Sequence, residues 1–201
     1  MMKKVDIVDV INFTYKSKNA IKEIAYKYQR PVKIYLHWTN EGYGIKNEDF
    51  HINIDANGDI YVSTNDFSEK KNHTYMRSAG SIGIALCCCN YSSSMNGFGN
   101  CSPTPEQIDM LSQIVAIITT AYDIPIEKHY VATYSEVADG ICDTEGYATG
   151  LFGPLKGNNE VWDLLSVEPE YPAIAIRSYD DPHNGGNVIR QKAKEYQVAF
   201  L

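Results

Sequence analysis

The sequence contains no apolar run of about 20 residues, the length that a transmembrane helix needs, so we expect no membrane span. It also lacks the apolar segment of a secretion signal, because Asp6 and Asp9 interrupt the N-terminal region where that segment would lie. We therefore expect synthesis in the cytoplasm without a signal peptide. Any action at a cell wall would then require a separate release route.

Clusters of basic residues are missing as well. Lys and Arg total 18 against 25 Asp and Glu, which gives a formal net charge of −7, and the basic residues are scattered along the chain. Proteins that bind nucleic acids normally carry a basic patch or stripe. We therefore expect no nucleic-acid partner.

Tryptophan is scarce, with two residues, whereas tyrosine is abundant, with 15. Tyrosines suit carbohydrate or peptide surfaces, but half-buried structural positions are the commoner explanation, because the ring can be buried while its hydroxyl stays hydrated. The five cysteines are an odd number, and three are consecutive at Cys87–Cys89. Consecutive strand residues point to alternate faces, so we expect small buried side chains in a reducing compartment rather than a metal cluster or redox site.

Hydrophobic periodicity predicts alternating helices and strands. A short amphipathic helix is expected over Ala20–Arg30, stopped by Pro31, followed by a strand over Val32–Thr39. A hairpin is expected next, with strands Phe50–Asp55 and Ile60–Ser63 and positive φ at both residues of its Asn57-Gly58 turn.

The helix expected with the clearest start runs over Pro105–Tyr122, opened by a capping box from Thr104 to Gln107. The remaining expected elements are a buried strand over Ser81–Cys88, a loop over Asn90–Ser102, a strand over Tyr130–Tyr134, an irregular segment over Asp139–Asn159 and a closing helix over Asn187–Tyr196.

These elements interleave without a domain-sized break. We therefore predict one α/β domain over residues 1–201, with a central mixed β-sheet flanked by helices.

His37 is the first candidate for a metal ligand. It lies at the end of a predicted strand, on the face opposite Ile34 and Leu36, where a side chain can reach a cleft. A lone histidine at a strand end is more often structural. Its interpretation therefore depends on the segments around it.

Several segments, taken in order, resemble those of a known family. In chain order, Ile34–Thr39 resembles an "HWT" strand, Phe50–Tyr61 a "YHINI…DGxIY" hairpin, His73–Leu86 the motif "HT…GSIGIAL" and Thr104–Tyr122 a "TPxQ" helix. Further along, Thr133–Asp139 resembles "THAEVAD", Glu160–Leu164 resembles "ERWDL", and Gly186–Ala193 resembles a closing helix. These are motifs of the type-2 N-acetylmuramoyl-L-alanine amidases, in their phage and bacterial branch. The peptidoglycan recognition proteins share that fold. The resemblance covers about residues 32–201, and the shared order makes it more specific than any single segment.

The resemblance implies one zinc ion, peptidoglycan or a muropeptide as partner, and hydrolysis of the amide between the lactyl group of muramic acid and L-alanine. Three protein ligands would leave a fourth position for a water whose pKa the metal lowers to about 7. The metal ligands by position are His37, Tyr134 and Asp163, and the catalytic residues are Glu136 and Tyr134. The implied substrate contacts are Trp38, Thr39, His51, His73 and Thr74, with structural roles open for the two histidines.

Three positions depart from the family pattern. Tyr134 stands where the family has its second histidine, Phe50 where many members have a tyrosine, and Val161 where Lys or Arg is usual. If the local alignment slips near Tyr134, His129 would take the place of the second histidine ligand, but His129 lies at the start of its strand rather than at its end. All three changes remove polarity from the same cleft.

Three functions are therefore open. The first is an active zinc amidase, such as an endolysin. The second is a zinc-free pseudo-amidase that binds a muropeptide without cleaving it. The third is an interaction or inhibitor protein that uses the same cleft for another ligand.

Overall fold

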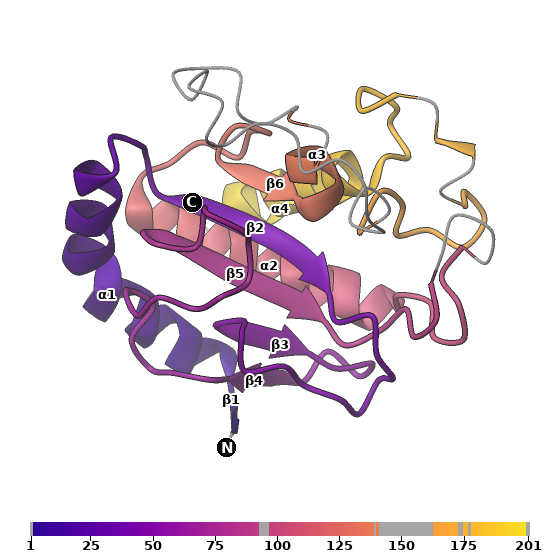
Figure 1. Cartoon of the computed structure of the whole chain (residues 1–201), viewed down its shortest axis with the longest axis horizontal. Coiled ribbons are helices and arrows are strands. Elements are labelled where there is room, and N and C mark those ends of the chain that lie inside the picture. The colour runs from indigo at the N-terminus through magenta and orange to yellow at the C-terminus, as the bar shows by residue number, and fades with distance from the viewer. Residues whose placement is uncertain are drawn as a thin grey trace.

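The computed structural model describes residues 2–92, 97–138, 140, 163–172, 175, 176 and 178–199. A six-stranded sheet runs through it in the order β1-β4-β3-β5-β2-β6 (Figure 1). The strands are β1 (Lys3–Val5), β2 (Lys33–Trp38), β3 (Ile52–Ile54), β4 (Ile60–Val62), β5 (Ser81–Leu86) and β6 (Val131–Thr133). The ladders β2–β5, β2–β6 and β3–β5 are parallel, and β1–β4 and β3–β4 are antiparallel.

Helices pack against this sheet. They are α1 (Ile7–Lys27), α2 (Pro105–Tyr122), the short α3 (Tyr134–Ala138) and α4 (Gly185–Ala199). In Figure 1, α2 lies behind β2 and β5, and it packs against both α4 and α1. The predicted α/β class, with a mixed sheet packed against helices, is confirmed.

The two faces of β2 have different environments, as strand alternation requires. Ile34 and Leu36 belong to the main core, together with buried residues of α1, α2 and α4. Tyr35 belongs to a smaller cluster with Ala132 and Val137 on the other face. His37 follows Tyr35 by two residues and therefore shares that second face, away from the large helices.

The predicted first helix was wrong in length, because α1 begins at Ile7 rather than Ala20. Asp6 caps its N-terminus, since the Asp6 side chain accepts a hydrogen bond from the Asp9 N–H at 2.9 Å. The strand β1, just before the helix, was not predicted either. It pairs with β4 through Lys3 and Val62 at one end and Val5 and Ile60 at the other.

The capping box of α2 is confirmed. The Thr104 hydroxyl accepts from the Gln107 N–H, and the Gln107 amide oxygen accepts from the Thr104 N–H. The Gln107 amide nitrogen also donates to the carbonyls of Ile54 and Cys87, at 2.9 and 3.2 Å. The start of α2 is thereby fixed to the ends of β3 and β5.

Two local predictions need correction. In the β3–β4 connection only Gly58 has a positive φ, of 79°, because the turn runs from Asp55 to Gly58, whose N–H donates to the Asp55 carbonyl at 2.9 Å, so Asn57 and Gly58 are not its two central residues. The Asp55 carboxylate also accepts from the N–H groups of Asn57 and Asp59. The strand expected over Tyr130–Tyr134 ends at Thr133, and Tyr134 instead begins α3.

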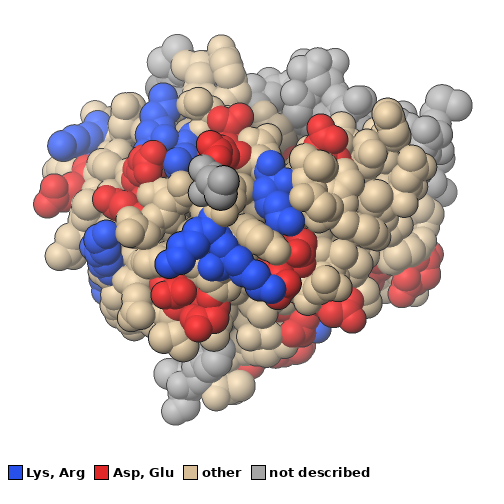
Figure 2. Space-filling view, turned by 90° about the horizontal axis from the view of Figure 1, so that it is seen from below, with Lys and Arg blue, Asp and Glu red and all other residues tan. Residues whose placement is uncertain are grey.

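The charged side chains of the folded protein are scattered over its surface, as they are along the sequence. Figure 2 views the molecule from the side on which β1 lies in Figure 1, and basic and acidic side chains are interspersed on that face. An exposed ion pair joins Lys4 of β1 to Asp59 at 2.5 Å. No helix in the described part of the chain combines the length and apolar character needed to cross a membrane.

Candidate functional site

His37 and Asp163, two of the three predicted metal ligands, lie together at the carboxyl end of β2. His37 Nδ1 is 3.2 Å from Asp163 Oδ2. The other carboxylate oxygen accepts the backbone N–H of Trp38 at 2.7 Å, and the Asp163 carbonyl accepts the N–H of Ser135 at 3.0 Å. The Trp38 N–H of β2 therefore holds the carboxylate beside the imidazole, and the Ser135 N–H of α3 holds the Asp163 backbone.

The second nitrogen of the His37 ring continues this network. His37 Nε2 is 3.0 Å from the Thr74 hydroxyl, which is 2.8 Å from His73 Nδ1. Asp163, His37, Thr74 and His73 thus form one hydrogen-bonded chain.

The protons of this hydrogen-bonded network have two self-consistent arrangements. If His37 Nδ1–H donates to Asp163, Nε2 accepts from the Thr74 hydroxyl, which in turn accepts from His73 Nδ1–H. A cation bound between His37 Nδ1 and Asp163 would reverse the direction of these hydrogen bonds. His37 would then donate from Nε2 to Thr74, and Thr74 would donate to His73. The protonated nitrogen of His37 therefore reports which state is present.

Two aromatic rings flank the imidazole of His37. The Phe50 ring centroid is 4.9 Å from that of His37, and the Tyr134 ring centroid is 4.6 Å away. His37 is 2% exposed and Asp163 is 5% exposed. The pair is therefore shielded from bulk water, and Tyr134 is the partly exposed side chain of this group.

His51 and His73 are buried behind this pair. His51 Nδ1 accepts the Gly83 N–H at 3.1 Å, and its Nε2 donates to the Glu69 carbonyl at 2.8 Å, so a neutral ring satisfies both positions. Burial lowers the pKa of His51 to about 4. Burial likewise holds the pKa of His73 well below its usual value, and the nearby His51 and His37 rings add to the effect. This geometry favours structural roles for the two histidines, which the sequence left open.

The other predicted substrate contacts differ in position. Trp38 belongs to the main core on the helix side of the sheet, so its ring faces away from His37. Thr74 is buried and occupied by the two histidines. Thr39 is half-buried, and its hydroxyl has no hydrogen-bond partner within the described residues. The Thr39 hydroxyl oxygen itself is buried, so Thr39 is not placed to contact a ligand in this structure.

Glu136, the other predicted catalytic residue, lies in a buried ion pair with Arg190 of α4. The two Arg190 terminal nitrogens donate to the two Glu136 oxygens at 2.9 and 2.7 Å, and Glu136 Oε2 also accepts the Thr133 N–H at 2.9 Å. Arg190 further donates to the Val131 carbonyl at 2.9 Å. Both carboxylate oxygens are engaged, so the geometry favours a role in joining α3 and α4 to β6.

The zinc ion implied by the family resemblance requires three protein ligands and an open position. The 3.2 Å between His37 Nδ1 and Asp163 Oδ2 is about the separation of two ligands around a tetrahedral zinc with bonds of roughly 2.1 Å. The third position falls to Tyr134, whose phenol is a weak ligand because phenols are neutral in water at pH 7. Within the described residues, no group of three or more His, Cys, Asp and Glu side chains is arranged to hold a metal. Among the described residues, His37 and Asp163 fit two zinc positions, and Tyr134 is the candidate for the third.

The order carboxylate, imidazole, hydroxyl also resembles a nucleophilic triad. Asp163, His37 and Thr74 are linked at 3.2 and 3.0 Å in the required sequence of atoms. Thr74, however, is 1% exposed and its oxygen is shared with His73. A substrate carbonyl cannot reach that oxygen, so the arrangement does not support acyl transfer.

Some predicted features lie outside the described residues. They include Val161, Cys142 and nearly all of the Asp139–Asn159 segment. The consecutive Cys87–Cys89 side chains are buried free thiols, and burial raises the pKa of Cys87 to about 12. Such thiols are chemically inert.

Comparisons of the chain with protein-family models, with curated proteins and with solved structures gave no match.

Proposed function

We propose that this chain is an amidase-type domain that binds a muropeptide without hydrolysing it. The observation that carries the proposal is the donor set around His37, which pairs one imidazole with one carboxylate and has the ring of Tyr134, the third ligand by the family resemblance, at a centroid distance of 4.6 Å. A catalytic zinc needs three good ligands to hold it while a water occupies the fourth position. The family resemblance supplies the class of ligand.

The shielding of the pair supports the same proposal. Phe50 and Tyr134 pack against the His37 ring, and both His37 and Asp163 are nearly inaccessible. Hydrolysis would need an attacking water and the scissile amide to meet beside these groups. Binding needs less, namely a partly exposed aromatic surface such as the Tyr134 ring.

The first test measures zinc affinity by competition with a chromophoric chelator. We expect weak binding by the unmodified chain and at least a roughly tenfold gain in Tyr134→His, because a neutral imidazole replaces a phenol as the third ligand. Tyr26→His, at a tyrosine that is 83% exposed, is the matched control and should leave the affinity unchanged. Equal affinities in the unmodified chain and Tyr134→His would show that Tyr134 is not at the ligand position.

The second test addresses ligand and reaction separately. Titration calorimetry with a muropeptide that contains N-acetylmuramoyl-L-alanine should show binding, and purified cell walls incubated with the chain and added zinc should release no stem peptide. Absence of heat would refute the binding half of the proposal. Release of stem peptide would refute the non-hydrolytic half and restore the active amidase.

A spectroscopic readout supports the interpretation of either result. In the absence of metal, His37 should carry its proton on Nδ1, and ¹⁵N chemical shifts of the ring identify that tautomer. A shift of the proton to Nε2 on addition of zinc would show that the ion enters between His37 and Asp163.

A further inference from the structure

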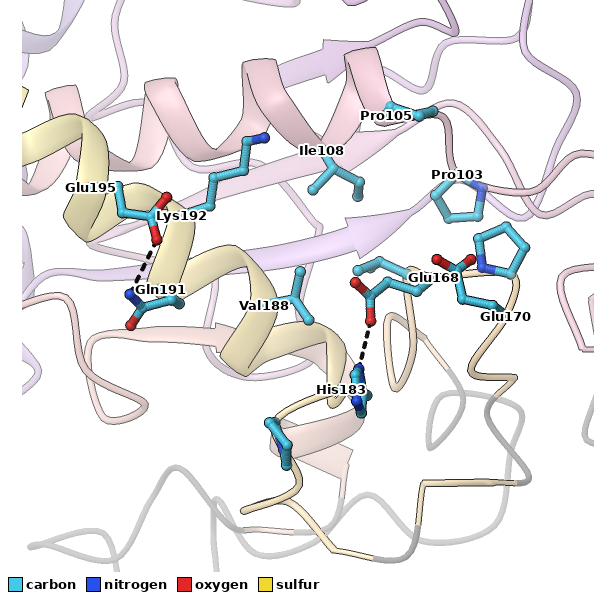
Figure 3. Close-up of a pocket in the computed structure, with 13 residues that line it drawn as sticks. Pro103, Pro105, Ile108, Glu168, Glu170, His183, Val188, Gln191, Lys192 and Glu195 are labelled. Carbon is cyan, nitrogen blue, oxygen red and sulfur yellow. Dashed lines mark hydrogen bonds and ion pairs between the residues drawn. The ribbon is translucent and has the colours of Figure 1, made fainter.

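A further region of interest lies on the helix side of the sheet, away from His37. It is a groove of about 710 Å³ between the start of α2, one side of α4 and the segment 167–170 (Figure 3). A volume of this size is typical of sites for small ligands or short peptides.

The walls of the groove are apolar. Ile108 of α2 and Val188 of α4 lie across it from one another (Figure 3). Four prolines complete the walls, namely Pro103, Pro105, Pro169 and Pro182. Proline has no N–H group, so these walls offer few hydrogen-bond donors to a ligand. They suit aliphatic side chains.

Carboxylates lie at both ends of the groove. Glu168 and Glu170 lie at the end near His183, and Glu195 lies at the other end (Figure 3). Glu170 and Glu195 are both exposed. A ligand lying in the groove would therefore meet negative charge at both ends.

The basic side chains that line the groove do not cancel this charge. Lys192 Nζ is committed to Asp109 Oδ1 at 2.9 Å, and that hydrogen bond raises the pKa of Lys192. His183 Nδ1 lies 3.0 Å from Glu168 Oε2, and its ring stacks on Tyr171 with centroids 3.4 Å apart. The stack fixes His183 as a wall beside Glu168. The rim therefore keeps an excess of negative charge.

We propose that this groove binds a short extended peptide in which two basic residues flank two apolar residues. In the polyproline II conformation, residues i and i+3 lie on the same side of the chain and about 9 Å apart, so the two basic side chains of such a peptide can extend toward opposite ends of the groove. The intervening pair would face Ile108 and Val188, and the cations would lie near Glu170 and Glu195. None of the residues that line this groove belongs to the group around His37.

The test uses the peptide acetyl-Lys-Leu-Pro-Lys-amide, whose proline favours the required conformation. Methyl resonances of Ile108 and Val188 should shift on titration, with a dissociation constant in the range of about 0.1–10 mM, as suits a ligand of this size. The affinity should fall as salt rises, because the ionic contacts lie at a solvated rim.

Matched peptides and variants decide the outcome. Glu170→Gln combined with Glu195→Gln should weaken binding by about fivefold to tenfold, whereas Glu23→Gln on the exposed surface of α1 should leave it unchanged. Peptides with both lysines replaced by Gln or by Glu should bind at least about fivefold more weakly. The proposal is overturned if those peptides bind equally well, if the double variant retains full affinity, or if the methyl resonances do not move.

Discussion

Gly83 of β5 determines how closely the buried histidines approach the sheet. A Cβ atom added at this position would lie 2.3 Å from His73 Cγ and 2.6 Å from its Cβ. Both distances are far below van der Waals contact. The ring of His73 therefore packs directly against the backbone of the strand, next to the His51 ring at a centroid distance of 5.5 Å.

Replacing Gly83 by alanine should force the His73 ring out of its site. We expect a loss of about 1–3 kcal/mol in the free energy of unfolding, as is typical of overpacking, measured by urea denaturation. Gly42→Ala is the matched control, since no atom lies within 4 Å of its added Cβ, and it should change stability by less than about 0.5 kcal/mol. Equal stabilities of the two variants would mean that His73 moves aside at no cost.

Part of the arrangement around His37 could be predicted from the sequence. Strand alternation placed His37 on the face away from Ile34 and Leu36, and the family resemblance paired it with Asp163, which lies 3.2 Å away. The sequence did not predict that the Thr74 hydroxyl joins two histidines or that Glu136 pairs with Arg190. Those contacts depend on side chains far apart in sequence, so no local pattern contains them.

Among the elements, α1 shows why a helix start can be missed. Its buried stripe is Val10, Thr14, Ser17, Ile21 and Ala25. Two members of the stripe are polar, and hydrophobic periodicity alone does not detect them. Thr14 donates to the Val10 carbonyl at 2.7 Å, while the Ser17 hydroxyl accepts the Phe67 N–H at 2.8 Å. The polar groups are thus satisfied inside the core, and the helix extends to Ile7.

The elements α3 and α4 are joined by the Glu136–Arg190 pair. Removing one partner leaves an uncompensated buried charge, so Arg190→Met should lower the free energy of unfolding by about 3–5 kcal/mol. Asp180→Asn is the comparison, because the Asp180 side chain is 92% exposed in its pair with Lys128 and should contribute little. Thermal denaturation of the two variants measures the difference. Similar losses in both would show that burial does not strengthen the pair.

Across the whole molecule, the buried histidines should make stability depend on pH. The pKa of His51 is about 4 in the folded state against 6.5 for an ordinary histidine, so the unfolded chain binds the proton first as the pH falls. The contribution of His51 is therefore fully present above pH 6.5 and is lost between about pH 6.5 and 4. That loss amounts to about 3 kcal/mol, and His73 acts in the same direction.

Urea denaturation at a series of pH values tests this expectation. His51→Gln should flatten the fall in stability between pH 6.5 and 4 by up to about 1.4 kcal/mol per pH unit, whatever its effect at pH 7. His129→Gln, at a partly exposed position, should retain the slope of the unmodified chain. A slope that His51→Gln leaves unchanged would mean that His51 is not the group that takes up the proton.

In the part of the chain that the structure describes, the two outer strands of the sheet are β1 and β6, with three residues each. An unpaired strand edge is a template on which another chain can add, and long flat edges promote aggregation. Here β1 presents the exposed Lys3 and Lys4, while the residues of β6 are buried and contact α3 and α4. Short length and positive charge at one edge, and helical cover at the other, should oppose edge-to-edge polymerisation of folded chains.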